Sequence, residues 1–161
     1  IIFNYQLLIK ALLIMSWKMT AQDLLELYEK GERDFAGVDL NGVDLSKAVL
    51  TGINLDRADL SEVNFSGADL SGGYGKARSP AYSSMRYAVL RNANFRDADV
   101  SYVNFERADL SFANFSWADC KGSCFDNACL LDVNFADTDL LQISFDGADV
   151  EGTILEDAEW V

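Results

Sequence analysis

Aspartate recurs at a fixed spacing along this chain, and paired carboxylates could support glycosidase chemistry or bind calcium. The aspartates that hold one position of a five-residue repeat include Asp39, Asp44, Asp59, Asp69, Asp99, Asp109, Asp119, Asp139 and Asp149. Asparagine holds the same position at 54, 64, 94, 104, 114 and 134. Catalysis and cation binding need the charge, whereas a chain corner needs only a short side-chain oxygen that accepts backbone hydrogen bonds. The exchange therefore favours a structural role for this position.

Other groups that could do chemistry are few. Histidine is absent, which removes the commonest general base and rules out a Ser–His or Cys–His nucleophile. The three cysteines, Cys120, Cys124 and Cys129, are odd in number and lack the fourth ligand and close pair spacing of a structural zinc site. We expect reduced thiols in a cytoplasmic compartment, no catalytic, cofactor or metal site, and a protein that is not an enzyme.

The charge of the chain limits its partners. Lys and Arg total 13 against 26 Asp and Glu, so the formal net charge is −13. Because such a chain repels phosphates, direct nucleic-acid binding is not expected. The same acidity can also be explained by solubility alone. Beyond Lys121 the sequence has no basic residue, and its acidic residues there are uncompensated.

The elements that position these residues follow from the five-residue repeat, which we call the pentad. Of the 26 central positions from 35 to 160, eleven are Leu, eight Phe and two Val. Two residues before each centre, twelve are Ala and seven are Val or Ile. A period of five fits neither a helix nor a strand, but it suits a coil in which each pentad forms one side and one corner, with two side chains inward.

The alternation of central residues predicts four sides for each turn of the coil. In the second half of the chain, Phe alternates with Leu, Val or Cys at successive centres. With 20 residues a turn, like residues would stack on like, one strand spacing apart. The expected core columns include Phe95, Phe105, Phe115, Phe125, Phe135 and Phe145, and Leu90, Leu110, Leu130 and Leu140.

The pentads AVLTG, INLDR, ADLSE and VNFSG resemble the A(D/N)LXX signature of the pentapeptide repeat family over residues 33–161. The resemblance implies an all-β, right-handed quadrilateral β-helix with an N-terminal helical cap, and a source similar to cyanobacteria, where the family is abundant. It also implies one specific activity, since some members are acidic, dimeric rods that mimic DNA and bind DNA gyrase.

The flanking segments carry further expectations. Residues 1–18 form an apolar leader, which is either a packed segment or a membrane tether. Residues 19–32 predict a capping helix, with Thr20 as N-cap, Asp23 in the capping-box position and Gly31 at the end. At the other end, Trp160 could cover the last coil, or the end could form a homodimer.

Two irregularities remain in the repeat. Residues 71–84 are rich in Gly and Ser and predict either a loop that leaves the pentad register unchanged or a poorly formed side of the coil. Four aromatic residues, Tyr87, Tyr102, Phe112 and Trp117, fall at outward positions and suggest a surface for a protein partner; alternatively, Tyr87 stacks with Arg107 one turn away. The sequence thus predicts a non-enzymatic structural or protein-interaction module whose partner is unknown.

Overall fold

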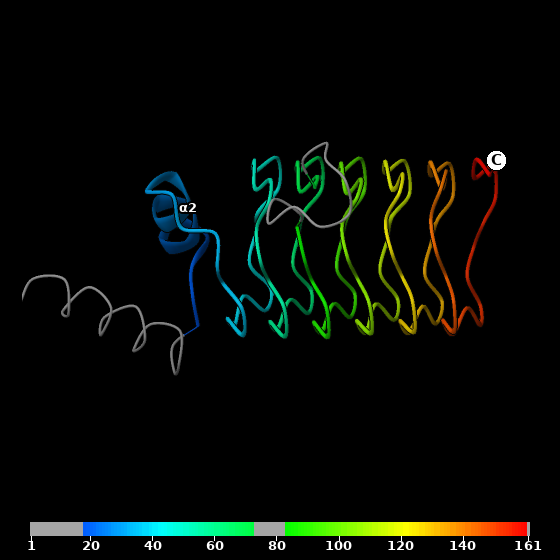
Figure 1. The fold of residues 1–161 in the computed structure, drawn as a ribbon, viewed down its shortest axis with the longest axis horizontal. Coiled ribbons are helices and arrows are strands. Elements are labelled where there is room, and N and C mark those ends of the chain that lie inside the picture. Colours follow the sequence, from blue (N-terminus) through cyan, green and yellow to red (C-terminus); the bar gives the residue numbers. More distant parts are fainter. Residues whose placement is uncertain (1–17, 73–82, 161) are drawn as a thin grey trace, which may run out of the picture.

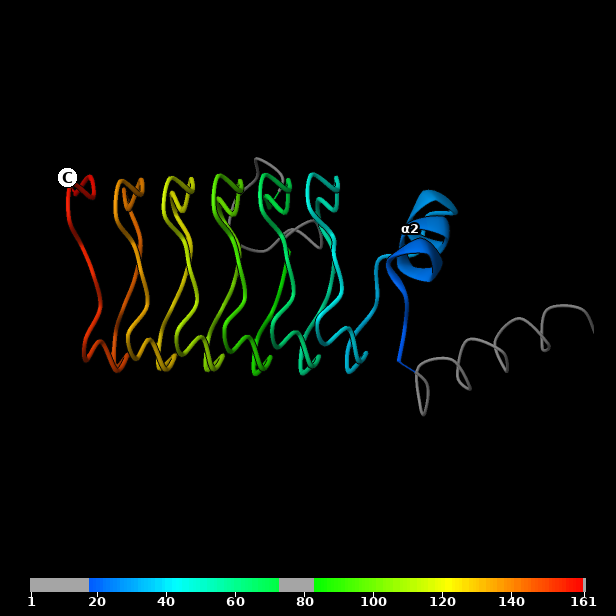
Figure 2. The ribbon, with the colours of Figure 1, turned by 180° about the vertical axis from the view of Figure 1, so that it is seen from behind.

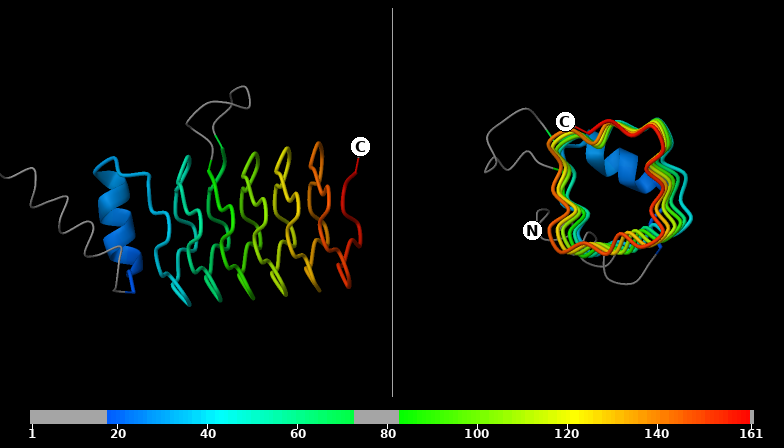
Figure 3. Two further views of the ribbon diagram at one scale, coloured as in Figure 1. Left: turned by 60° about the horizontal axis from the view of Figure 1, so that its bottom comes forward. Right: turned by 90° about the vertical axis from the view of Figure 1, so that its right-hand side faces the viewer.

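The chain forms a rod of stacked coils with a helix at one end. The computed structural model describes residues 18–72 and 83–160. Within these ranges the only helix is α2 (Ala21–Glu29), which lies beside the first coil. The coils follow in chain order toward the C-terminal end (Figures 1 and 2), and the view along the rod shows that each coil is square (Figure 3).

The register of the coils follows from their β-bridges. Bridge residues lie at every fifth position from 34 to 69 and from 84 to 159, and every bridge is parallel. Away from one interruption the partners lie 20 residues apart, as in Asp34 with Asn54. The four-sided coil predicted from the Phe alternation is therefore confirmed. Within the described residues no strand is longer than a single bridge, because each five-residue side turns a corner before a second bridge can form.

The pentad satisfies its backbone N–H groups almost completely. In the pentad that begins at Phe115, the five N–H groups donate to the carbonyls of Asn134, Ala136, Phe115 and Ala98 and to Oδ1 of Asn114, at 2.8 to 3.1 Å. Four of the five bonds use backbone carbonyls, and only the N–H of Ser116 depends on a side chain. Since an unpaired buried N–H is costly, this bond explains why Asp or Asn precedes the centre.

Replacing Asn114 with alanine should lower the free energy of unfolding by about 1–3 kcal/mol, because it leaves the N–H of Ser116 unpaired in a buried turn. Asn114→Asp keeps the acceptor and should change stability much less. Urea unfolding of the two variants tests this. Equal losses would mean that the amide, not the acceptor oxygen, is what the corner requires.

At two of the corners that lack Asp or Asn, those of Ser84 and Ser144, a carboxylate from the preceding coil supplies the acceptor. Asp56 Oδ1 accepts from Ser84 Oγ at 2.5 Å and from the N–H of Arg86 at 2.9 Å. Asp126 Oδ1 likewise accepts from the hydroxyl of Ser144 and from the N–H of the residue two positions later. The hydrogen bond from Ser144 is the main cause that lowers the pKa of Asp126. The corner N–H, which elsewhere bonds the Asp or Asn of its own coil, thus bonds a carboxylate of the preceding coil at these two corners.

Stacked phenylalanines fill two opposite columns of the interior. The rings of Phe95 and Phe115 stack with centroids 4.5 Å apart, and Phe115 stacks on Phe135 at 5.1 Å. Rings of the other column, such as Phe105 and Phe125, meet them edge to face, at 5.9 and 5.8 Å from Phe115. The remaining two columns contain the leucines predicted to be buried, and all four are buried: Leu90, Leu110, Leu130 and Leu140. The predicted core columns are buried except Phe145, which is partly exposed in the last described coil.

Helix α2 begins as the sequence indicates and is shorter than the predicted segment 19–32. Thr20 Oγ1 accepts from the N–H of Asp23 at 3.1 Å, and the Asp23 carboxylate accepts from the N–H of Thr20 at 3.2 Å, which completes a capping box. Leu24 is fully buried. Tyr28 donates its hydroxyl to the carbonyl of Thr51 at 2.8 Å, so the helix is attached to the first coil.

The interruption adds ten residues without changing the register. Asn54 pairs with Ser84, 30 rather than 20 residues away, and the rings of Phe65 and Phe95 stack across it at 5.3 Å. Part of the predicted loop, 71–84, belongs to the coil, because the N–H of Gly72 bonds the carbonyl of Ser101 at 2.8 Å. Residues 73–82 lie outside the described part of the chain.

Candidate functional site

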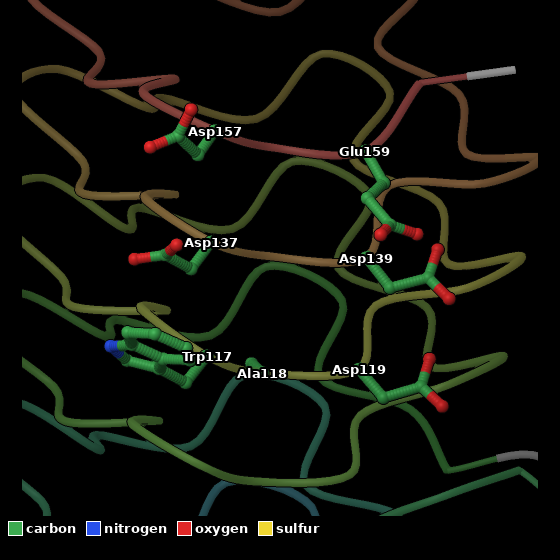
Figure 4. A pocket seen from close by; sticks show the side chains of 7 residues that line it. All are labelled: Trp117, Ala118, Asp119, Asp137, Asp139, Asp157 and Glu159. Carbon is green, nitrogen blue, oxygen red and sulfur yellow. The ribbon is translucent and has the colours of Figure 1, made fainter.

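One side of the last coils carries a hollow lined mainly by acidic side chains. The hollow has a volume of about 400 Å³ and is lined by Trp117, Ala118, Asp119, Asp137, Asp139, Asp157 and Glu159. Figure 4 shows that these side chains come from three successive coils and form two parallel columns. We call this feature the acidic groove.

The repeat itself positions the two columns. Asp119, Asp139 and Glu159 precede the pentad centres and pair through successive parallel bridges. Trp117, Asp137 and Asp157 occupy the corner position two residues after a centre, where φ is 65°, 55° and 53°. Positive φ at the third residue is a feature of type II turns, and it directs the side chain away from the core. Trp117 is accordingly 56% exposed.

The carboxylates of the groove repel one another. Burial is the main cause that raises the pKa of Asp119, and the charges of Asp99 and Asp139 raise it further, against the hydrogen bond that the N–H of Lys121 donates. Within the described ranges, no salt bridge involves a carboxylate of the acidic groove. The groove is therefore a region of concentrated negative charge.

A neighbouring column of the same rod shows that the fold does not need this charge. The Asp column comprises Asp69, Asp99, Asp119, Asp139 and Glu159, whereas the Asn column comprises Asp44, Asn64, Asn94, Asn114 and Asn134. Both provide the acceptor for the corner N–H. In the Asn column, amides also link the coils, as Asn64 Nδ2 donates to Asp44 Oδ1 at 3.0 Å and Asn94 Nδ2 to Asn64 Oδ1 at 3.1 Å. Stacked carboxylates cannot form such bonds, so the Asp column carries like charges where asparagine would be more stable.

Asp119→Asn should therefore raise stability at neutral pH. The pKa of Asp119 is raised in the folded state, so its contribution to stability is fully present below the unfolded pKa and is lost as pH rises through the folded pKa. Asparagine keeps the acceptor for the N–H of Lys121 and removes the repulsion. Urea midpoints at pH 7 and pH 3 test this: the variant should exceed the wild type at pH 7, and the difference should shrink at pH 3. An equal gain at both values would contradict the electrostatic cause.

The four aromatic residues predicted as a partner surface do not share one face. Because the coil repeats every 20 residues, Tyr87, Tyr102, Phe112 and Trp117 occupy four different corners of the square. Phe112 is 53% exposed and Tyr87 is 37% exposed, while the ring of Tyr102 lies against the backbone of Gly122, where a Cβ would approach it to 2.5 Å. Only Trp117 of the four lines the acidic groove.

Tyr87 instead forms the stacked arrangement given above as the alternative. The guanidinium groups of Arg57 and Arg107 each lie 5.6 Å from its ring centroid, one from the coil before and one from the coil after. Arg107 Nη1 also donates to the Tyr87 hydroxyl at 3.0 Å. The prediction of a Tyr87–Arg107 contact is thus confirmed. Glu106 lies beside two arginines of this cluster: its Oε1 lies 3.7 Å from Arg107 Nε, and its Oε2 lies 3.3 Å from Arg86 Nε.

The remaining candidate groups show no arrangement for chemistry. Cys120, Cys124 and Cys129 are free thiols, and burial is the main cause that raises the pKa of Cys120 well above its ordinary value. In the part of the chain that the structure describes, no three His, Cys, Asp or Glu side chains are placed to hold a metal ion. No helix in residues 18–72 or 83–160 has the length and apolarity to cross a membrane. The predicted leader, 1–18, lies outside these ranges apart from Lys18.

The acidic groove has a signature in the sequence, but its residues are not adjacent there. Acidic residues recur 20 apart at two positions of the pentad, before the centre and two residues after it, and both series continue to residues 157 and 159. Only the coil period of 20 places the two series on one side.

Comparison with known proteins agrees with this architecture. Eight copies of the family described as pentapeptide repeats match residues 34–72, 81–111 and 113–152. None of the curated protein sequences matches the chain significantly. Among solved structures, a pentapeptide repeat protein from Nostoc Pcc 7120 is 28% identical, with a TM-score of 0.60 over 71% of this chain and 84% of that one.

Two other solved structures are more distant. A pentapeptide repeat protein from the cyanobacterium Cyanothece 51142 is 20% identical over 88% of this chain and 100% of its own, with a TM-score of 0.41. QnrB1, a plasmid-mediated fluoroquinolone resistance protein, is 20% identical over 74% of this chain and 56% of its own, with a TM-score of 0.36. The repeats, the square coil and the matched residues together show that this chain belongs to the pentapeptide repeat family and has its right-handed quadrilateral β-helix.

Proposed function

We propose that the protein is a non-enzymatic interaction module, a rigid β-helical rod that presents the acidic groove to a protein partner. The observation that carries this proposal is the contrast between the Asp and Asn columns, because the fold is satisfied by either residue and the charge has no structural use. Most of the large apolar side chains in the described residues are buried in the core. A partner can therefore contact only the outward-facing side chains, among which the acidic groove stands out.

The proposal is tested by capturing partners from native lysate with the intact protein and with Asp137→Asn/Asp139→Asn. Both substitutions preserve shape, since Asn tolerates the positive φ of residue 137 and keeps the acceptor that residue 139 offers to the N–H of Leu141. A partner lost by the variant but retained by Asp132→Asn/Glu151→Gln, which removes two charges elsewhere on the same coils, supports the proposal. Reproducible turnover of a small molecule, abolished by one surface substitution, would overturn it.

A second candidate is a DNA mimic that binds DNA gyrase. The resemblance to family members of that kind motivates it, and the parallel columns of carboxylates on a narrow rod favour it. The basic residues around Tyr87 depart from an evenly anionic rod. A supercoiling assay with purified gyrase decides the matter, because unchanged supercoiling at a large excess of the protein removes this candidate.

Homodimerisation through the C-terminal coils is a separate proposal. The coil at 141–160 exposes Val150, Ile154, Leu155 and Trp160, between 41% and 49%, and the ring centroids of Trp160 and Phe145 lie 6.0 Å apart. Exposed apolar side chains of this kind favour association with a second copy. Light scattering of the wild type and of Ile154→Lys tests it: a monomeric wild type would contradict the proposal.

The N-terminal segments have proposed roles as well. Helix α2 covers the apolar end of the first coil, a role for which the burial of Leu24 is the support. We also propose that the rod works in the cytoplasm. Tethering through residues 1–18 remains an alternative prediction, and membrane fractionation with and without that segment distinguishes it: a fully soluble full-length protein would count against a tether.

A further inference from the structure

We propose that Asn41 is a site of spontaneous deamidation, which the first coil keeps unreactive while α2 is docked against it. The inference concerns the N-terminal end of the rod and does not depend on the proposed partner surface. Asn41 is the only asparagine in the sequence that is followed by glycine. Because glycine has no Cβ, its backbone nitrogen can approach the asparagine side chain with the least steric hindrance. In the unfolded chain, Asn41 is therefore the asparagine most prone to this reaction.

The reaction needs no reactant other than water. The backbone nitrogen of Gly42 attacks Cγ of Asn41, and the proton of that N–H leaves with the side-chain nitrogen as ammonia. The product is a five-membered succinimide ring. Water then opens the ring at one of its two carbonyl carbons and leaves either aspartate or isoaspartate at position 41.

The folded corner opposes each part of the ring closure. The N–H of Gly42 donates to the carbonyl of Ser61 at 2.8 Å, so the attacking nitrogen is engaged with the next coil. Gly42 has φ of 67°, and the N–H of Val43 donates to the carbonyl of Leu40 at 2.9 Å. These are the features of a type II turn, in which ψ of the second residue, here Asn41, is extended. Ring closure needs a different rotation about that bond, so Asn41 reacts only after the corner opens.

Hydrogen bonds rather than packing hold this corner closed. Apart from its chain neighbours, no heavy atom would lie within 4 Å of a Cβ placed at Gly42. The N–H of Asn41 donates to Oδ1 of Asp39 at 3.0 Å, and the remaining bonds are those of the turn and of the next coil. Separation of the first coil from the second therefore removes the main protection of Asn41.

Helix α2 controls how often that separation occurs. The N–H of Met19, next to the N-cap of α2, donates to the carbonyl of Asp39 at 2.9 Å, two residues before Asn41. Tyr28 of α2 donates its hydroxyl to the carbonyl of Thr51 at 2.8 Å. Since each repeat of a solenoid contacts only its neighbours, loss of α2 should open the first coil more often than the coils further along the rod.

Isoaspartate at position 41 would make the opening irreversible. Isoaspartate places the side-chain methylene in the main chain, so one side of the square becomes longer by one atom. The parallel bridges on either side of the corner, Asp39 with Asp59 and Asp44 with Asn64, could then not both keep their register. The altered coil would no longer present the surface that α2 covers.

The test is the deamidation rate of the full chain at neutral pH, followed by mass spectrometry of the tryptic peptide 34–47, in which Asn41 is the only asparagine. The folded wild type should react at least about tenfold more slowly than the chain unfolded in guanidinium chloride. Leu24→Ala should accelerate the reaction of the folded protein by about tenfold. Tyr28→Phe removes one hydrogen bond to the first coil and should accelerate it by about threefold.

The matched control is Phe115→Ala, which removes a fully buried side chain far from the first coil and should leave the rate within about twofold. The proposal is wrong if Asn41 stays unmodified in the unfolded chain or if the folded and unfolded chains react equally fast. It is also wrong if Phe115→Ala accelerates the reaction as much as Leu24→Ala, because deamidation would then follow global unfolding. Circular dichroism shows whether each variant is folded, and Tyr28→Phe carries the comparison if Leu24→Ala is not.

Discussion

Replacing Phe115 with alanine is expected to lower the free energy of unfolding by about 3–5 kcal/mol, the usual loss on deleting a buried Phe. The ring is fully buried and stacks on Phe95 and Phe135 at 4.5 and 5.1 Å. A square coil is held apart by its own backbone hydrogen bonds, so neighbouring side chains cannot collapse into the space that the ring leaves. The large end of the range therefore applies.

The matched control is Phe112→Ala, three residues away on an exposed corner. It removes the same side chain without opening a cavity and should change stability by about 0.5 kcal/mol at most. Urea unfolding followed by circular dichroism gives both values. If the two variants unfold at the same denaturant concentration, the assignment of inward and outward positions in the pentad is wrong.

Leu24→Ala is expected to cost about 2–5 kcal/mol, because Leu24 is fully buried. The loss should be concentrated at the N-terminal end, since in a solenoid each repeat contacts only its neighbours. Hydrogen exchange of the first coil, in which the N–H of Leu40 bonds the carbonyl of Asp59, should accelerate more than exchange around Phe115.

The control for α2 is Glu26→Ala on the exposed side of the same helix. It removes a hydrogen bond from Gln22 at 2.9 Å and should alter stability by a few tenths of a kcal/mol, about the value of a surface pair. Uniform acceleration of exchange along the rod in Leu24→Ala would argue against a local role of the helix.

Much of the fold could be predicted because the repeat links residue type to position. The inward Phe and Leu columns, the four sides and the acceptor role of Asp and Asn depend on interactions between near neighbours or between positions 20 apart. The capping box of α2 is likewise local, since it joins Thr20 and Asp23. The interactions of the repeat recur in every coil, so a single irregular pentad does not change the prediction of the fold. The exceptions themselves, such as Asp56 accepting from the N–H of Arg86, could not be foreseen, because they depend on which side chain reaches across to the next coil.

The surface was harder to predict. Tyr87, Tyr102, Phe112 and Trp117 share the outward position of the pentad, but they project from four different corners. Residues five apart in this fold point in directions that differ by one side of a square. Residues 20 apart lie side by side, and the acidic groove is built from such residues.

The amino-acid sequence by itself determined the coil, since an apolar residue at every fifth position can be buried only if the chain turns a corner in each pentad. It also determined the net negative charge and its concentration after Lys121. Only the tertiary structure decided where that charge is presented and that Trp117 stands beside it. The physical reason is that stacking sets neighbours one coil apart, so a binding surface on this rod is a property of the coil period rather than of adjacent residues.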